Sequence, residues 1–378
     1  MGRPDDYGLR DEATPFPDWP RPRGCIGWRP VSRRQTLVLA LVALLSAAAG
    51  VLHYADGPAV AAFAVAGLAL AGLAWIVALA TEALGERFGP GATGLLQSTL
   101  GNLPEFFVVL FALNAGEIRV AQTSLIGSVL ANGLLVLGLT IIIGARHASD
   151  GVMRFNSRLP NDTMTLLMLA VFVIVILGIA GSSNDAAAAD AKSISVIGSV
   201  CLLAVYLLWL WSYLRGDPAA EPATGTRMPL STTIGLLAVA GVGAAFVSDW
   251  FIAALAPAID SLGVSKEFAG LVIVAIAGNA VENVTALLLA AKGQSDLAIS
   301  VVKNSVAQIA VFLFPALILV SLLLSHSLTF VLPPVYIAAL GLSAVAIWQI
   351  TGDGEARDYE GAALVALFVI VAAVAWFE

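Results

Sequence analysis

Two glutamates lie in strongly apolar stretches of this chain, inside two copies of one short motif. The copies, Gly101-Asn102-Leu103-Pro104-Glu105 and Gly278-Asn279-Ala280-Val281-Glu282, are 177 positions apart. The match at this offset runs without a gap from 101 to 132 and from 278 to 309, and eight of these 32 positions are identical. A carboxylate in hydrocarbon costs on the order of 3 kcal/mol, so it marks an ion or proton pathway. Its occurrence in both halves predicts a transporter built from internal repeats.

The composition of each motif indicates a hard oxygen site. Glycine in mid-segment loosens the helix, and the neighbouring asparagine can replace lost backbone hydrogen bonds. Such broken backbone is tolerated in a membrane only where it faces protein or water. Freed carbonyls and a carboxylate suit Ca²⁺, Na⁺ or H⁺ rather than a soft metal. Two facing carboxylates could hold one Ca²⁺ or two protons, but they could not both stay charged and empty. This competition is the physical basis of antiport, and the residues that we expect to carry it are Gly101, Asn102, Glu105, Gly278, Asn279 and Glu282.

Polar side chains in the segments after each motif are candidates to line the site. Ser128 and Ser305 are equivalent by the repeat and are the stronger candidates. Membrane helices also use Ser, Asn and Gln simply to pack, so both interpretations stay open for each residue alone. The other candidates are Gln122, Ser124 and Asn132 in the first half, and Asn304 and Gln308 in the second.

Three charged residues in or beside apolar segments need an explanation. Glu82 and Asp249 either line an access path for cations or are solvated acids. Lys303 lies about eight residues into an apolar segment, where the repeat has Ile126. A lysine there either extends toward the membrane surface or neutralises charge near the glutamates.

The composition places these residues in a membrane protein. Hydrophobic residues make up 59% of the 378 residues and charged residues 12%, and the mean hydropathy is +0.91. Soluble domains carry about 25% charged residues. We therefore expect a polytopic membrane protein whose partners are the lipid bilayer, inorganic cations and protons. We expect no enzyme activity, no nucleic-acid partner and no cofactor.

Helices of about 20 apolar residues are needed to cross the bilayer. Eleven segments qualify, which predicts an all-α fold with about eleven transmembrane helices. They are 35–54, 58–82, 91–114, 118–144, 163–181, 192–214, 230–256, 265–291, 295–324, 328–350 and 360–377.

The distribution of Lys and Arg sets the orientation. With the N-terminus in the cytoplasm, fifteen of the 19 basic residues fall on the cytoplasmic side and three outside. The C-terminus is then outside. Glu105 and Glu282, on the third and eighth segments, enter the membrane from opposite sides, which predicts inverted-topology repeats with a site near the midplane. The expected organisation is a disordered basic tail (1–34), a peripheral first helix (35–57), a five-helix repeat (58–214), a cytoplasmic linker (215–229) and a second five-helix repeat (230–378).

The paired Gly-Asn-x-x-Glu motifs resemble the two repeats of the calcium/cation antiporter superfamily, the sodium/calcium exchanger membrane region. The resemblance covers 81–144 and 265–319. Its cation/proton exchanger branch is the more similar, through Gly116-Glu117-Ile118-Arg119-Val120 and Ser265-Lys266-x-Phe268. The resemblance implies one peripheral helix plus two inverted sets of five. It also implies that Glu105 and Glu282 bind cation and proton alternately, surrounded by Asn102, Asn279, Ser128, Ser305 and Gln308.

Four departures from the branch put the cation in doubt. Asn283 stands where many relatives have His, Lys303 precedes Asn304 and Ser305 where Gly is frequent, and Gln97 stands where Asn is usual. An acidic stretch between the halves is missing. Our expectation is a Ca²⁺/H⁺ antiporter of a bacterial-type inner membrane that exports cytosolic calcium by alternating access. The alternatives are Na⁺ or K⁺ exchange for H⁺ on the same fold and an uncoupled cation channel, against which the paired carboxylates argue.

Overall fold

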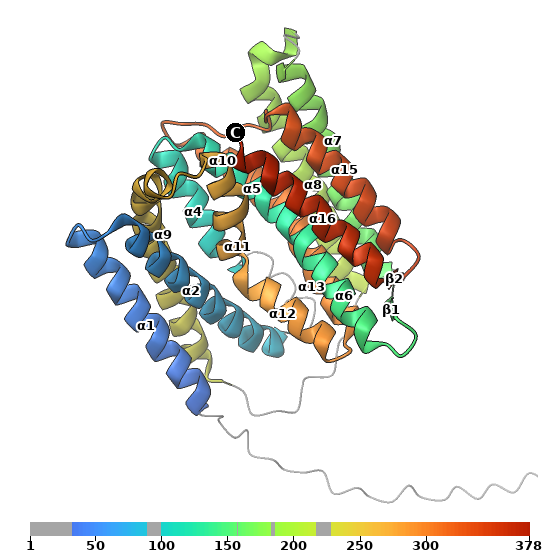
Figure 1. The fold of residues 1–378 in the computed structure, drawn as a ribbon, viewed down its shortest axis with the longest axis horizontal. Coiled ribbons are helices and arrows are strands. Elements are labelled where there is room, and N and C mark those ends of the chain that lie inside the picture. Colours follow the sequence, from blue (N-terminus) through green and yellow to red (C-terminus); the bar gives the residue numbers. More distant parts are fainter. Residues whose placement is uncertain (1–31, 89–99, 157, 183–185, 217–227) are drawn as a thin grey trace, which may run out of the picture.

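The computed structural model of this chain describes residues 32–88, 100–156, 158–182, 186–216 and 228–378, and almost all of them are helical (Figure 1). In this described part, nine helices are long and apolar enough to cross a membrane, and a bent helix pair would make a tenth. The predicted all-α membrane class is confirmed. The expected third span, 91–114, lies partly outside the described residues, as do the basic tail 1–31, Gln97 and most of the linker 215–229.

The helices of the first half begin with the peripheral span α1. One span of this first half is built from three consecutive pieces, α5, η1 and α6, of which η1 is a π-helix. The elements are α1 (Arg33–Tyr54), α2 (Ala59–Phe88), α4 (Leu103–Asn114), α5 (Ile118–Leu130), η1 (Ala131–Val136), α6 (Leu137–His147), α7 (Arg158–Ser182), the 3₁₀ turn η2 (Ala186–Asp190) and α8 (Ala191–Gly216).

The second half repeats this order. Here α13, η4 and α14 form the composite span, and a helix pair bends by 63° between α11 and α12. The elements are α9 (Leu230–Leu262), α10 (Lys266–Phe268), η3 (Ala269–Val274), α11 (Ala275–Gly278), α12 (Ala280–Ala291), α13 (Ser295–Gln308), η4 (Ile309–Leu313), α14 (Phe314–Ser321), α15 (Pro334–Thr351) and α16 (Asp358–Trp376).

Local chemistry explains several helix ends. Ser32 caps α1 through a capping box with Gln35, so two otherwise unpaired backbone N–H groups at the helix start are satisfied. Gly263 ends α9 in the left-handed conformation, with φ of 65°. The expected start of a span at 328 is wrong, because Pro333 and Pro334 fix the first turn of α15 and the residues from 327 to 333 are not helical.

A two-stranded ribbon joins two connections that the sequence predicted only as loops. β1 (Val152–Arg154) pairs antiparallel with β2 (Glu355–Arg357), so that Val152 lies opposite Arg357. Arg154 also contacts Asp150 at 2.6 Å and Glu355 at 3.2 Å. Strands of three residues are too short to show a two-residue period, and the pairing partner is about 200 residues away. The ribbon is therefore a product of the tertiary structure.

Helices from the two halves pack in a reciprocal way. α2 packs against α9, and α1 covers both. α16 packs against α6 as α8 packs against α14, and α4 contacts α9 and α14 as α12 contacts α2 and α6. In Figure 1, α4, α11 and α12 lie between the α1–α2–α9 group and the group formed by α5, α6, α7, α13, α15 and α16. Two copies of one unit related by a two-fold axis would produce this exchange of neighbours.

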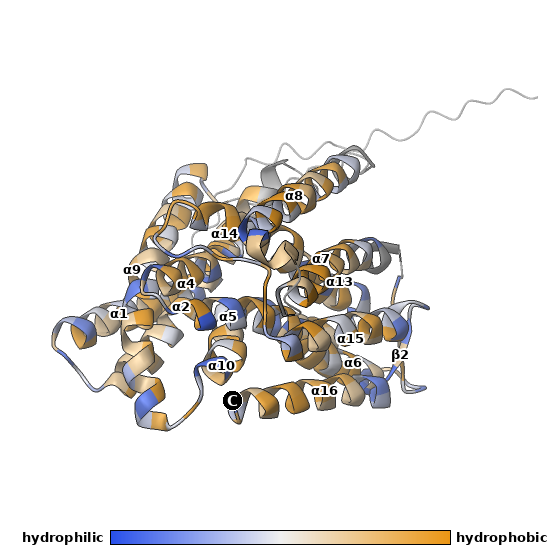
Figure 2. Cartoon of the chain, turned by 90° about the horizontal axis from the view of Figure 1, so that it is seen from above, coloured by the Kyte–Doolittle hydropathy of each residue, from blue (hydrophilic) through white to orange (hydrophobic). Residues whose placement is uncertain are grey.

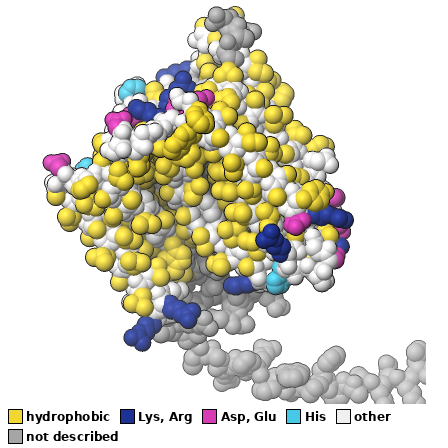
Figure 3. Space-filling view, in the orientation of Figure 1, with side chains coloured by type: hydrophobic (Ala, Val, Ile, Leu, Met, Phe, Trp, Pro, Cys, Tyr) yellow, Lys and Arg dark blue, Asp and Glu magenta, His cyan; other side chains and the backbone are white. Residues whose placement is uncertain are grey.

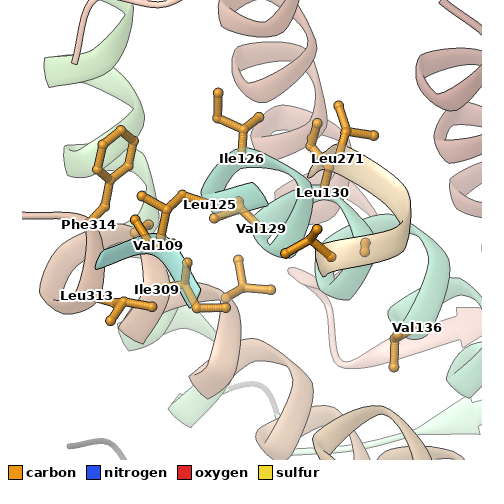
Figure 4. Packing of buried hydrophobic residues seen from close by; sticks show 14 of the residues in the cluster. Val109, Leu125, Ile126, Val129, Leu130, Val136, Leu271, Ile309, Leu313 and Phe314 are labelled. Carbon is orange, nitrogen blue, oxygen red and sulfur yellow. The ribbon is translucent and has the colours of Figure 1, made fainter. Parts of the chain in front are cut away.

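Hydrophobic and charged side chains are distributed as expected for a protein that lies in a membrane. The helices are hydrophobic along their lengths, and the polar residues lie mostly at their ends (Figure 2). Charged side chains gather at two opposite ends of the face in Figure 3, with hydrophobic side chains between them. Inside, α4, α5, η3 and η4 share one hydrophobic cluster, in which Val109, Leu125, Leu271 and Ile309 are fully buried (Figure 4).

Candidate functional site

Both glutamates occupy the first turn of a helix that starts next to a break. α4 begins at Leu103 after Asn102, and α12 begins at Ala280 after Asn279, whose φ of −107° and ψ of 18° interrupt the helix. Glu105 and Glu282 are each the third residue of their helix. The N-terminus of a helix presents free N–H groups and a positive partial charge, which favours a carboxylate there. Each break thus positions its own glutamate.

The two motifs meet in the interior of the protein. A β-carbon placed on Gly278 would lie 3.7 Å from Cβ and 3.9 Å from Cγ of Glu105. Glu105 therefore packs directly against the break of the other half. Its side chain is 3% exposed, and the polar groups that act on it electrostatically are Ser128, Asn279 and Glu282. Glu282 is less buried than Glu105.

The carboxylate oxygens of Glu105 are buried acceptors that no hydrogen bond of good geometry satisfies within the described part of the protein. The Oδ1 atoms of Asn132 and Asn283 are also buried and also lack a hydrogen-bond partner within the described part of the protein. Unsatisfied buried oxygens are costly unless a cation, proton or water completes them. Among the described residues no three His, Cys, Asp or Glu side chains converge. A cation bound at Glu105 and Glu282 would therefore take its remaining ligands from amide, hydroxyl or backbone oxygens.

Four side chains behind the glutamates form one hydrogen-bonded network. Asn279 Nδ2 donates to Ser128 Oγ at 2.9 Å and to the Ala275 carbonyl at 3.0 Å. Asn132 Nδ2 donates to Ser305 Oγ at 3.0 Å and to Asn279 Oδ1 at 3.3 Å. The structure thereby brings together the two serines that the repeat equates. Each serine accepts from the asparagine of the opposite half, so the network ties the second motif, through Asn279, to α5 and η1 of the first half.

Two π-helical segments stand at equivalent positions beside this network. η1 follows Ser128 and η4 follows Ser305, and the two segments end at positions that are equivalent by the repeat, Val136 and Leu313. A π-helix shifts the backbone hydrogen bonds by one residue, and such bulges concentrate at functional sites. The sequence contains no proline at the start of either segment. Only the repeat itself could have pointed to them.

The other predicted residues lie around this centre or apart from it. Asn102 is buried at the start of α4, and Gly101 is partly buried. Gln122 donates to the Val331 carbonyl at 3.0 Å and so fastens the connection before α15. Asp249 is exposed on α9, and the side chain of Glu82 on α2 lies outside the described residues. Ser124 donates to the Ala121 carbonyl of its own helix, and Asn304 and Gln308 are partly exposed on α13 next to Ser305.

Lys303 is buried in an apolar environment on α13, two residues before Ser305. It is 4% exposed, and its Nζ donates to Thr351 Oγ1 at 2.6 Å, at the last residue of α15. Val302, Val306 and Ile347 line the small cavity around it. The ammonium thus extends toward the end of α15.

Asn283 is the residue that the sequence reasoning did not place in the site. It follows Glu282 directly, and its buried Oδ1 has no partner in the described structure. Its position beside the motif was a signal, but it was interpreted only as a departure from a family pattern.

An all-helical membrane protein with carboxylates at two broken helices has the architecture of an ion transporter. The chain belongs to the sodium/calcium exchanger protein family, whose sequence model matches residues 58–214 and 232–377. It is 32% identical over 365 residues to a Ca²⁺/H⁺ antiporter of Synechocystis sp., which covers 90% of this chain and 97% of that protein. It is 30% identical over 338 residues to the Ca²⁺/H⁺ antiporter ChaA of Bacillus subtilis, covering 87% and 94%. The solved structure of native YfkE is 28% identical, with a TM-score of 0.76 over 91% of this chain and 99% of that one. The family resemblance of the motifs is thus confirmed.

Proposed function

We propose that the protein exchanges Ca²⁺ for H⁺ across the membrane by alternating access to a site formed by Glu105 and Glu282. The observation that carries this proposal is the meeting of the two motifs. Glu105 is buried against Gly278, next to Glu282, and its oxygens lack a hydrogen-bond partner in the described structure. Ca²⁺ takes six to eight oxygen ligands, which two carboxylates and the neighbouring Asn and Ser oxygens can begin to supply. Relatives described as Ca²⁺/H⁺ antiporters support this choice of cation.

Coupling follows from the charge of the site. Two empty carboxylates close together in a low dielectric repel each other and lack hydration. Ca²⁺ neutralises both, and so do two protons. A site that is stable only when loaded with one or the other cannot return empty, and this requirement distinguishes an antiporter from an uncoupled channel.

We further propose that the two halves are inverted repeats, with the N-terminus cytoplasmic and the C-terminus outside, in a bacterial-type inner membrane. Several contacts between connections support this topology, because each joins segments that it assigns to one face. Lys266 pairs with Glu117 at 2.7 Å, and Ser265 Oγ contacts the Ala375 carbonyl, on the assigned outer face. The β1–β2 ribbon joins two connections on the assigned cytoplasmic face.

The alternative of Na⁺ or K⁺ exchange is favoured if the Lys303 ammonium lies beside the glutamates. Lys303 Nζ instead donates to Thr351 at the end of α15. This position favours the interpretation that Lys303 extends toward the membrane surface, and it leaves the two carboxylates free to balance a divalent cation.

Everted membrane vesicles containing the full chain test the proposal. A ΔpH is imposed, and Ca²⁺, Na⁺ or K⁺ is added while a pH-sensitive dye reports the gradient. We expect Ca²⁺ to dissipate ΔpH, and we expect Glu105→Gln or Glu282→Gln to lower the rate by about 100-fold or more. Losing a group that merely supports a metal ligand already costs about 10- to 100-fold.

The matched control is Asp260→Asn, which makes the same change from acid to amide at an exposed position of α9. It should retain the wild-type rate. Dissipation that survives in both glutamine variants, or that Na⁺ drives as well as Ca²⁺ does, would refute the proposal.

A further inference from the structure

A cluster of aromatic rings joins the end of the peripheral helix α1 to α9. The His53 imidazole stacks on the Trp250 indole, with ring centroids 6.0 Å apart and an interplanar angle of 25°. The rings of Tyr54 and Phe246 lie 6.0 and 6.3 Å from the same indole. The indole also meets α1 at Gly50, where a β-carbon would lie 3.0 Å from its Cη2 atom. None of these residues has a role in the proposed cation site.

An open cavity of about 310 Å³ lies beside these rings, between the end of α1, the start of α2 and α9. Most of its wall is small and apolar, formed by alanines of the three helices and by Pro257. His53 and Trp250 also line it, and Asp56 supplies the one carboxylate among the described residues of the wall. The turn that carries Asp56 lies at one edge of the molecule (Figure 1). The cavity therefore combines an aromatic ring, a carboxylate and an apolar floor.

The backbone at Asp56 is unusual for a residue with a side chain. Its φ is 48°, and among the described residues it is the one non-glycine residue with a positive φ. Gly57 N–H donates to the Leu52 carbonyl at 2.9 Å, which is the long bond of a Schellman motif with Asp56 at the left-handed position. Glycine occupies that position most often, and a residue held in a sparsely populated conformation is a reason to look for a function.

The charge around the cavity is negative. Asp56 is exposed, and its carboxylate forms no ion pair or hydrogen bond with any other residue that the structure describes. The three helices carry few bases: α9 has no Lys or Arg, and those of α1 and α2 are Arg33, Arg34 and Arg87, at the helix ends remote from the cavity. Asp249 adds a second acid next to Trp250. Charge complementarity therefore favours a cationic ligand.

The surface that continues from the cavity is the apolar flank of the protein. Phe246 contacts Trp250, and Val242 and Val239 lie one and two turns further along the same face of α9; all three are exposed. Tyr54, the last residue of α1, is exposed as well. Aromatic residues at the end of a membrane span typically lie at the level of the lipid headgroups. A cationic ligand with an apolar tail on this flank is a lipid rather than a soluble amine.

We propose that this cavity binds the headgroup of phosphatidylethanolamine. The Asp56 carboxylate accepts from the primary ammonium, the Trp250 indole attracts its charge through the ring face, and an acyl chain follows Phe246 and Val242. A primary ammonium has three N–H donors for the carboxylate, whereas the trimethylammonium of phosphatidylcholine has none. Under the proposed topology the lipid belongs to the outer leaflet. Only this assignment to a leaflet rests on the proposed function.

Thermal unfolding of the full chain, delipidated in detergent, tests the site without any transport. Saturating dioleoyl phosphatidylethanolamine should raise the unfolding temperature of the wild type by about 3 °C or more. Dioleoyl phosphatidylglycerol, which has no ammonium, and dioleoyl phosphatidylcholine should each produce less than about a third of this rise. Asp56→Asn keeps the size of the side chain but removes its charge, and it should reduce the response to phosphatidylethanolamine by about three-fold or more. Asp56→Gly should reduce it equally, because glycine adopts this φ freely and preserves the turn.

Asp249→Asn is the matched control. It makes the same change from acid to amide next to Trp250, at an exposed position that does not line the cavity, and it should keep the full response. A full response in both Asp56 variants would overturn the proposal, as would a response to phosphatidylglycerol equal to that to phosphatidylethanolamine. An equal loss in Asp249→Asn would show a general effect of surface charge and would also overturn it. No outcome depends on Ca²⁺ or on a pH gradient, so a failure of the exchange proposal leaves this test intact.

Discussion

Gly127 lets the backbones of the two halves approach each other closely, and replacing it with alanine should damage both the stability and the site. Gly127 lies on α5, one residue before Ser128. A β-carbon there would lie 2.2 Å from the carbonyl oxygen of Leu271 and 2.5 Å from its Cα, in the backbone of η3. Contacts of real Cβ atoms are rarely closer than 3.4 Å, so the two segments must separate by about 1.2 Å.

The size of the destabilisation depends on whether the atoms that the new methyl group meets can move away. Overpacking costs about 1–3 kcal/mol and occasionally more. Because the clash here is with backbone rather than with a flexible side chain, we expect the upper end, about 3 kcal/mol. The same shift would lengthen the bond from Asn279 Nδ2 to Ser128 Oγ from 2.9 Å to about 4 Å, which breaks it. Gly127→Ala should therefore lower the affinity for Ca²⁺ as well as the stability.

Thermal unfolding in detergent and Ca²⁺ titration calorimetry would measure the two effects. Gly235→Ala is the control, since nothing lies within 4 Å of a β-carbon at this position of α9. Alanine should be neutral or stabilising there because it favours the helix by up to about 1 kcal/mol. If Gly127→Ala and Gly235→Ala unfold at the same temperature, the reasoning from close approach is wrong.

Two further predictions concern buried polar groups. Asn279→Ala removes three side-chain hydrogen bonds. Thermal unfolding should show a loss of about 2–3 kcal/mol of unfolding free energy. Calorimetry should show weaker Ca²⁺ binding. Wild-type affinity in this variant would exclude the network from the site. Thr351→Val leaves the Lys303 ammonium buried without this partner and should destabilise by about 1–3 kcal/mol, whereas Lys303→Met removes the charge and should be neutral or stabilising. Thermal unfolding compares these two variants, and a larger loss in Lys303→Met would contradict this account.

The sequence predicted the spans well where hydrophobicity alone decides them. The expected spans 35–54 and 192–214 differ from α1 and α8 by no more than two residues at either end. Prediction failed where a partner distant in sequence decides the structure. The β1–β2 ribbon needs a strand from each half, and α9 continues to Leu262, past its expected end at 256 and through Pro257. Helix ends of this kind depend on packing against other helices.

The candidate site shows the same division. The motifs, their glutamates and the equivalent serines followed from one chain compared with itself. The pairing of Asn279 with Ser128 did not follow, and neither did that of Asn132 with Ser305, because both pairs cross between the halves. The role of Lys303 did not follow from the sequence either, because an apolar segment does not reveal in which direction a long side chain extends. Its bond to Thr351 depends on where α15 ends.

The sequence by itself determined that this is a membrane protein with two related halves, each carrying a carboxylate at a weakened point of a helix. These properties follow from composition and local backbone chemistry, which a single segment already expresses. Only the tertiary structure decided that Glu105 packs on the Gly278 of the other half and that Asn279 bonds to Ser128 across the two halves. Such contacts depend on how helices from the two halves cross, and glycines set how close these crossings become.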